Sequence, residues 1–238
     1  MKKVSLLSLF LLFGLISCGQ KINLGKVINS VLSGASLTEA EAGEGIKEAL
    51  SVGINLGADK ASALDGYFNN PKIRIPFPPE VQRVETTLRG IGLGGEVDKF
   101  ILALNRGAEN AAQQAKPIFI SAIKQLTIRD AINILRGEKD AATQFLKRTT
   151  SVQLLQAFEP YVIKSLENTQ ATKYYSDLAN AYNKVPFVSK INSDLKGYAT
   201  QRAIDGLFVL VAEEEAKIRE NPLARTSELL KKVFGNNK

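Results

Sequence analysis

Apolar residues recur at every third or fourth position through most of this chain, and this spacing constrains the fold more than any other feature. The pattern is clearest after Glu96, where one face carries Val97, Phe100, Ile101, Leu104, Ala108, Ala111, Ala112 and Ala115. Such positions form one stripe of an α-helix, which is buried against other helices. No convincing strand pattern accompanies it. The sequence therefore predicts an all-α fold.

Capping and breaking residues divide this pattern into a single irregular bundle of about ten helices. Thr38-Glu39-Ala40-Glu41 is a capping box, so a helix is predicted over 38–63. The others are predicted over 79–89, 96–126 with a kink at Pro117, 128–135, 139–148, 152–168, a tyrosine-rich stretch ending before Pro186, 193–219 and 227–234, with a short one within 21–34. Ser151 is predicted to cap the helix that follows it, and Asn192 or Ser193 to cap the last long helix.

One proline-rich stretch interrupts the helices. Ile73-Arg74-Ile75-Pro76-Phe77-Pro78-Pro79 is predicted to be an extended crossover, because residues before proline avoid the helical region and proline has no N–H to donate. We expect Ile73, Ile75 and Phe77 to insert into the bundle. The preceding Asp65 to Pro71 segment is predicted to form turns.

Two patterns indicate where the helices pack most closely. Phe208-Val209-Leu210-Val211-Ala212 is apolar on every side, which predicts the central buried helix. Gly45, Gly53 and Gly57 place small residues on one face of the 38–63 helix. We expect another helix to approach that face closely.

The first eighteen residues have the composition of an export signal. Lys2 and Lys3 precede an apolar run that is shorter than the ~20 residues needed to cross a bilayer. The run ends in Leu15-Ile16-Ser17-Cys18, which resembles the lipobox of bacterial lipoproteins, and Cys18 is the only cysteine. The alternative is an ordinary signal with an incidental cysteine. We expect a signal peptide over 1–17, a lipidated N-terminus and tether over 18–35, and a single helical domain over 36–238.

A lipidated Cys18 would anchor the protein in a membrane of the bacterial cell envelope, facing the periplasm. Stable anchoring takes more than one acyl chain, so two or three palmitate-like chains are expected. Without Lys2 and Lys3 the chain carries 29 basic and 24 acidic residues. This small positive net charge should give a mild attraction to anionic headgroups. Because these charges are interspersed and form no basic stripe, we expect no nucleic acid as a partner. The expected partners are the membrane and an envelope protein.

Missing residue types restrict the chemistry. The chain contains no histidine, and acylation of Cys18 would leave no thiol, so histidine or thiolate metal sites and Ser-His-Asp triads are excluded. Gly90-Ile91-Gly92-Leu93-Gly94-Gly95 matches a dinucleotide-binding pattern. It follows a helical segment instead of a strand, so we interpret it as a helix–helix connection. We expect no metal and no cofactor.

A polar cluster within the bundle is the remaining candidate site. Asn105, Arg106 and Glu109 share one helix, and Asp205 precedes the all-apolar stretch of another. One interpretation makes Arg106–Glu109 and Arg202–Asp205 exposed pairs of little energetic weight. The other has Arg106 bridge between helices to Asp205 in a partly buried pair that fixes their register.

The run Glu213-Glu214-Glu215 is the best raw material for carboxylate chemistry. Consecutive helical residues diverge by about 100°, so these carboxylates should not share a substrate. Glu215 and Arg219 are four residues apart and are expected to form an ordinary surface pair.

Several sequence blocks resemble an uncharacterised family of exported helical proteins, domain-of-unknown-function family 4197. The blocks are Gly45 to Leu50, Asp65 to Pro71 with Ile75-Pro76, Leu104 to Glu109, Ala122 to Gln125, Asp130-Ala131, Ala141 to Thr143, Ala203 to Phe208 and Ile218 to Pro222. Together they cover roughly residues 35–235. The resemblance implies a helical, exported protein and supplies no activity, ligand or catalytic residue.

Three functions remain open at this point. The first is a non-catalytic envelope module that binds a partner or supports membrane organisation. The second is a carrier, with an apolar ligand held between helices near Phe119, Phe158 and Phe208. The third is a hydrolase or lyase that uses carboxylates.

Overall fold

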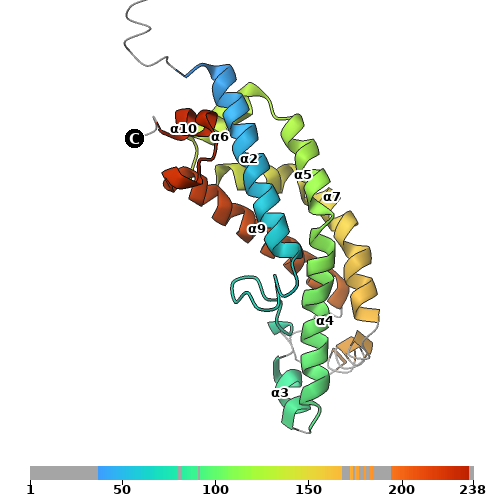
Figure 1. The fold of residues 1–238 in the computed structure, drawn as a ribbon. Helices are drawn as coiled ribbons and strands as arrows, with labels where there is room; N and C mark the ends of the chain where they lie inside the picture. Colours follow the sequence, from blue (N-terminus) through green and yellow to red (C-terminus); the bar gives the residue numbers. More distant parts are fainter. Residues whose placement is uncertain are drawn as a thin grey trace, which may run out of the picture. The chain divides into compact units, whose positions relative to one another are not determined.

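Helices form every regular element of the described part of the chain (Figure 1). The computed structural model describes residues 37–79, 82–90, 92–167 and 194–235, with Thr172, Lys173, Tyr175, Ser176, Asn180, Asn183 and Lys184. The elements are α2 (Glu39–Ser62), α3 (Gln82–Gly90), α4 (Gly94–Ala112), α5 (Ala115–Lys124), α6 (Ile128–Arg136), α7 (Ala141–Glu167), α9 (Leu195–Glu220), the 3₁₀-helix η2 (Pro222–Ala224) and α10 (Glu228–Gly235). The all-α prediction is confirmed.

The described residues hold fewer helices than the predicted number of about ten, and the helix predicted within 21–34 lies outside them. Within them, α7 is one continuous helix where two were predicted. The sequence predicted a break near Arg148 and a cap at Ser151. Instead, the Ser151 hydroxyl donates to the carbonyl of Lys147, one turn back within the helix. Thr150 donates in the same way to Leu146. A serine or threonine hydroxyl can either cap a helix or bond back to a carbonyl within it. Here the buried face of α7 continues past both residues, so the helix does not break.

The break between α4 and α5 comes earlier than the kink predicted at Pro117. The helices separate at Gln113 and Gln114. Pro117 has no N–H for the carbonyl of Gln113, four residues before it, and its ring crowds that carbonyl. Beginning α5 at Ala115 places Pro117 in the first turn, where the missing N–H has no helical partner to lose.

Other helix ends follow their caps closely. Thr38 and Glu41 form the predicted capping box of α2, and Thr127 and Asp130 form one at α6. The cap of α9 is Asp194, which accepts from the Gly197 N–H, and the predicted caps Asn192 and Ser193 lie outside the described residues. Most of the predicted tyrosine-rich helix also lies outside them.

The proline-rich crossover is extended, as predicted. Residues 74–76 have no helical or turn geometry, and Ile73, Ile75 and Phe77 are buried. α3 begins at Gln82, later than the start predicted at Pro79. The Gly90 to Gly95 run connects α3 to α4, and Gly92 has a positive φ of 87° that favours glycine.

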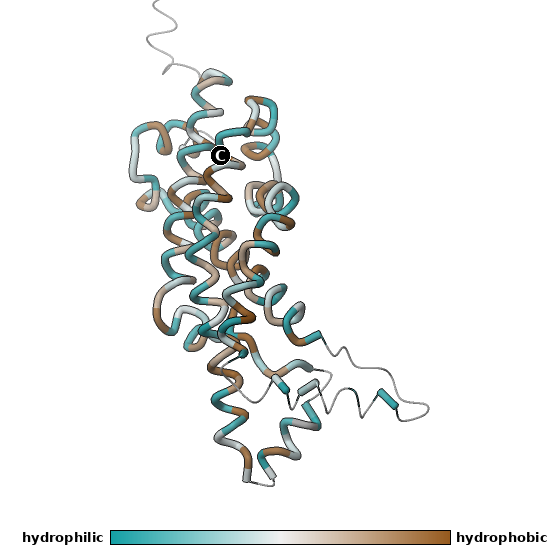
Figure 2. The backbone as a smooth tube through the Cα atoms, turned by 90° about the vertical axis from the view of Figure 1, so that its right-hand side faces the viewer, coloured by the Kyte–Doolittle hydropathy of each residue, from teal (hydrophilic) through white to brown (hydrophobic). Residues whose placement is uncertain are grey.

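Helix α9 lies at the centre of the bundle and packs against α2, α4 and α7 (Figure 1). Brown and teal segments alternate along the helices in Figure 2, as expected for helices with a buried and a solvent-facing side. Leu207, Phe208, Leu210 and Val211 are buried. Val209 is 39% exposed, so the helix is not buried on every side as predicted.

The small residues of α2 allow the close approach that the sequence predicted. A Cβ at Gly57 would lie 3.3 Å from the backbone nitrogen of Val211 in α9. The backbones of α2 and α9 therefore cross with almost no side chain between them at this point. The chain divides into two units at Ser36, and all described residues belong to the second, Leu37–Lys238.

Phe208→Ala should lower the free energy of unfolding by about 3–5 kcal/mol, because the ring is buried and packs edge-on against Phe119, with 5.7 Å between the ring centroids. Val209→Ala is the matched control at the next position, which is exposed, and it should change the free energy of unfolding by about 0.5 kcal/mol or less. Urea unfolding of both variants measures the difference. Equal costs would contradict this placement of Phe208.

Candidate functional site

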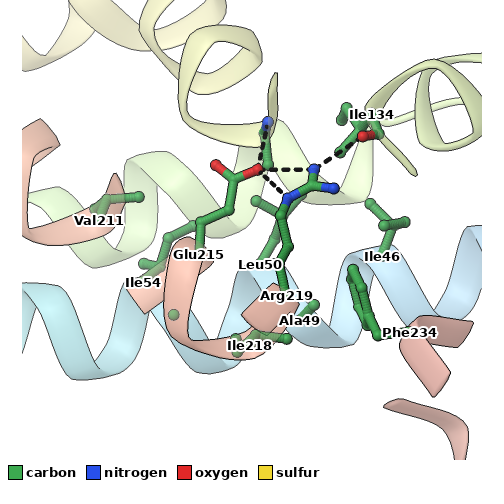
Figure 3. A pocket seen from close by; sticks show the side chains of 12 residues that line it. Ile46, Ala49, Leu50, Ile54, Ile134, Val211, Glu215, Ile218, Arg219 and Phe234 are labelled. Atoms are coloured by element: carbon green, nitrogen blue, oxygen red, sulfur yellow. Dashed lines mark hydrogen bonds and ion pairs between the residues drawn. The ribbon is translucent and has the colours of Figure 1, made fainter. Parts of the chain in front are cut away.

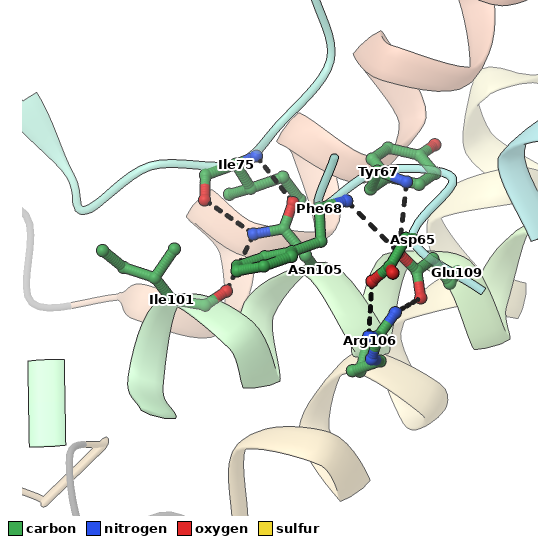
Figure 4. A network of polar contacts seen from close by, with 8 residues as sticks. All are labelled: Asp65, Tyr67, Phe68, Ile75, Ile101, Asn105, Arg106 and Glu109. Carbon is green, nitrogen blue, oxygen red and sulfur yellow. Dashed lines mark hydrogen bonds and ion pairs between the residues drawn. The ribbon is translucent and has the colours of Figure 1, made fainter. Parts of the chain in front are cut away.

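The predicted polar residues of α4 face the segment that links α2 to α3. Asn105 and Glu109 are four residues apart, so they lie on the same side of α4, and both are buried. That side faces the turns and the extended crossover of residues 63–79 (Figure 4). The interior of a helix pairs its own backbone groups, whereas an irregular buried segment needs hydrogen-bond partners from elsewhere in the protein.

Asn105 satisfies the backbone of the crossover at Ile75. Its Oδ1 accepts from the Ile75 N–H at 2.9 Å, and its Nδ2 donates to the Ile75 carbonyl at 2.9 Å. Nδ2 also donates to the carbonyl of Ile101 in the preceding turn of α4. One side-chain amide thus replaces the neighbouring strand that an extended segment would otherwise require.

Glu109 satisfies the turn before the crossover. Its Oε1 accepts from the backbone N–H groups of Tyr67 and Phe68 at 3.1 and 3.2 Å. Its Oε2 accepts from Arg106. The other end of the Arg106 guanidinium donates to Asp65 at 2.6 Å, which gives the buried carboxylate a shared counter-charge near the surface.

The turn itself is tightly constrained at two adjacent residues. Asp65 has a positive φ of 63°, a conformation that aspartate tolerates better than most residues. A Cβ at Gly66 would lie 2.2 Å from the carbonyl oxygen of Lys60. Only glycine fits there, so the turn packs directly on the last turn of α2.

Tyr67 connects the turn to α9. It is fully buried, and its hydroxyl donates to the Ala203 carbonyl at 2.6 Å. Its ring packs directly on Gly206, because a Cβ at that glycine would lie only 2.7 Å from the ring carbon Cε1. Burial, with smaller effects from Glu109 and Asp205, raises the pKa of Tyr67, so the hydroxyl stays protonated and remains a donor.

Arg106 does not bridge to Asp205. Asp205 accepts from Gln201 at 3.0 Å and lies 3.9 Å from Arg202, both on its own helix. Asn105, Arg106 and Glu109 all bind the segment between α2 and α3, and Asp205 lies apart from their hydrogen bonds. The α4 residues are matched to the segment before them in the chain, because the irregular backbone there needs their donors and acceptors.

A second buried network, missed by the sequence analysis, lies at the turn between α6 and α7 (Figure 3). Glu215 accepts from the N–H groups of Ala142 and Thr143 at 3.0 and 2.8 Å and from the Thr143 hydroxyl. It also pairs with Arg219 at 2.8 Å, and Arg219 donates to the Ile134 carbonyl. The pair thus binds the N-terminal donors of α7 and a C-terminal carbonyl of α6.

The prediction of an ordinary Glu215–Arg219 surface pair is therefore wrong. The two side chains are only 8% and 14% exposed. One signal could have indicated this: Glu215 lies four residues after Val211 and three before Ile218, so it shares the apolar face of α9. Spacing showed that Glu215 and Arg219 would meet, and not that they would be buried.

The three consecutive glutamates serve three separate contacts, as predicted from their divergence. Glu213 pairs with Lys72, and Glu215 pairs with Arg219. Glu214 accepts from Lys60 and Lys217. Burial alone would raise the pKa of Glu214, but these lysines outweigh it and hold the pKa below its ordinary value, so the carboxylate is ionised at neutral pH.

An apolar pocket lies beside Glu215 and Arg219 (Figure 3). Its walls come from α2, α6, α7, α9 and α10, with Phe234 of α10 at one side. Its volume is about 20 Å³, enough for roughly one water molecule. A carrier's ligand site would measure at least about 300 Å³, so this pocket does not support that function.

Each buried carboxylate of the two networks is thus occupied by protein donors. Within the described residues, no buried side-chain nitrogen or oxygen lacks a hydrogen-bond partner. No group of three or more acidic or thiol side chains there is arranged to hold a metal ion. The two networks have a direct structural role, because they fix an extended crossover and a helix–helix turn.

These features define an all-helical protein stabilised by buried polar contacts to irregular backbone. Residues 36–235 match the family model described as protein of unknown function (DUF4197), so the chain belongs to that family. The resemblance found in the sequence is confirmed. No curated protein and no solved structure matches the chain.

Three of the sequence blocks that carried the resemblance meet around Tyr67. They are Asp65 to Pro71, Leu104 to Glu109 and Ala203 to Phe208. These blocks are distant in the chain and adjacent in the fold. The blocks on which the resemblance rests thus include the residues that hold the turn and the crossover against α4 and α9.

A double-mutant cycle between Arg106→Ala and Asp65→Ala should show a coupling energy of about 0.5–1 kcal/mol, because both side chains are about one-third exposed. The matched cycle between Arg106→Ala and Asp205→Ala should show none within error. Urea unfolding supplies the free energies. Coupling to Asp205 as large as that to Asp65 would contradict the observed pairing.

Glu215→Ala should destabilise the protein by about 3–5 kcal/mol, because it leaves Arg219 buried without its counter-charge and removes the acceptor from two α7 N–H groups. Glu213→Ala, two residues away, removes a more exposed ion pair and should cost less than about 1 kcal/mol. Thermal or urea unfolding distinguishes them, and similar costs would show that Glu215 has no special structural weight.

Proposed function

We propose that this protein is a lipid-anchored lipoprotein of the bacterial cell envelope whose helical unit acts as a non-catalytic binding or structural module. The observation that carries the proposal is Leu15-Ile16-Ser17-Cys18 at the end of the apolar N-terminal run. Cys18 is the only cysteine, so its place directly after a small residue at the end of that run is specific. Acylation there attaches the chain to a membrane facing the periplasm.

The state of the buried carboxylates supports a non-catalytic role. A general acid or base needs an oxygen that can reach a substrate proton. Glu109 receives two backbone N–H groups and Arg106, and Glu215 receives two backbone N–H groups, a hydroxyl and Arg219. These two carboxylates are thus committed to holding the bundle's own backbone and counter-charges.

The helical unit contributes surface instead of an interior binding site under this proposal. The pocket beside Glu215 has room for about one water molecule and is too small for a ligand. Under the proposal, a partner therefore binds on the outside of the bundle. None of the helices in the described ranges is long and apolar enough to cross a membrane. Attachment through Cys18 supplies the membrane contact, and the helices supply the protein contact.

Replacing Cys18 with Ser should abolish lipidation and release the protein from the membrane, because the serine hydroxyl is not a substrate for thioether formation. Cells fed an alkyne analogue of palmitate should label the wild-type chain and leave Cys18→Ser unlabelled, as measured by in-gel fluorescence after purification.

Ser17→Ala is the matched control, since alanine is also small and should preserve both labelling and membrane fractionation. Label retained in Cys18→Ser would overturn the lipoprotein proposal. A wild-type chain without label would do the same.

A further inference from the structure

The outward face of α7 carries apolar side chains that no other described helix covers. Its inward residues are buried, and the helix packs against α4, α5 and α9; they include Leu146, Thr150, Leu154, Phe158 and Val162. On the opposite side Val152 is 71% exposed and Leu155 is 42% exposed. Exposing a valine and a leucine one turn apart leaves apolar surface in water that a partner can bury.

These side chains follow the spacing by which one helix receives another. Phe145, which is half-buried against the core, and the exposed Val152 and Leu155 are separated by seven and then three residues. Positions with this spacing lie along one edge of a helix and present side chains to a second helix packed against it. We define these three residues as the α7 strip.

A surface hollow continues the α7 strip toward α6. Its volume is about 280 Å³, and it is lined by Asp130, Asn133, Ile134, Glu138, Asp140, Ala141, Gln144, Phe145 and Arg148. Phe145 therefore belongs to both the hollow and the strip. The hollow is large enough for one long side chain.

The hollow is acidic, although the protein as a whole is basic. Three carboxylates and one guanidinium line it, against a net charge of +7 for the chain. Hydrogen bonds from Thr127 lower the pKa of Asp130, so this carboxylate is ionised at neutral pH. Phe145 adds an aromatic face, against which a cation can lie.

We propose that the α7 strip and this hollow together dock an amphipathic helix of a protein partner, with a lysine or arginine side chain of that helix in the hollow. Charge complementarity selects the occupant: the carboxylates repel an anionic membrane surface and attract a basic side chain. The inference rests on the proposed role as a binding module and names the chemistry of the partner.

A pair of synthetic helical peptides tests the proposal on the full-length chain. Both carry leucines at the spacing of the α7 strip; one ends in two lysines and the other in two glutamates. The lysine peptide should bind at least tenfold more tightly than the glutamate peptide in fluorescence anisotropy. Its affinity should fall as salt rises from 50 to 300 mM, because the hollow contributes through charge.

Variants then locate the binding. Val152→Glu should weaken the lysine peptide at least tenfold, and Glu138→Gln with Asp140→Asn should remove most of its preference over the glutamate peptide. Leu223→Glu is the matched control, because Leu223 is 91% exposed on η2 and lies outside the strip. It should leave affinity within twofold.

Several results would overturn the proposal: no binding of the lysine peptide, equal binding of both peptides, or equal losses in Val152→Glu and Leu223→Glu. Circular dichroism checks that each variant keeps its helices, which the exposure of Val152 and Leu223 favours. Palmitate labelling at Cys18 is independent of these measurements, so failure here and failure of the lipid anchor are distinguishable.

Discussion

The bundle depends on side chains that satisfy the backbone of its irregular segments. Asn105 and Glu109 of α4 take the hydrogen bonds of Ile75, Tyr67 and Phe68, which belong to a segment with no helical partners of its own. Without them, burying the backbone of Tyr67 and Ile75 would cost about 1–3 kcal/mol for each unpaired amide. This pairing lowers the cost of placing Ile73, Ile75 and Phe77 in the core.

The Glu215–Arg219 pair solves the same problem at the turn between α6 and α7. The last carbonyls of one helix and the first N–H groups of the next have no partners within their own helices. α9 brings a carboxylate to the N–H groups and a guanidinium to the carbonyl, which also matches the charge at each helix end. Thus the central helix positions both the turn before the crossover, through Ala203, and the turn between α6 and α7, through Glu215 and Arg219.

This use of charge bears on function. A buried ion pair adds little net stability compared with apolar side chains of similar volume. It does strongly disfavour arrangements that would leave either charge unpaired. In this bundle the pairs bind specific backbone groups, so they select one arrangement of α4, α7 and α9. The interior is then committed to its own structure, and the acidic hollow and the α7 strip are surface features that remain for recognition.

The sequence by itself determined the all-α class, the cap at Thr38, the extended crossover and the family, because these depend on neighbouring residues and period. Tertiary structure decided three other matters. It made α7 continuous through Ser151, where the hydroxyl bonds within the helix. It buried Glu215 and Arg219, whose spacing looks the same at a surface. It gave Arg106 to Asp65 instead of Asp205, since pairing across the fold follows from which helices meet, and no local pattern encodes that.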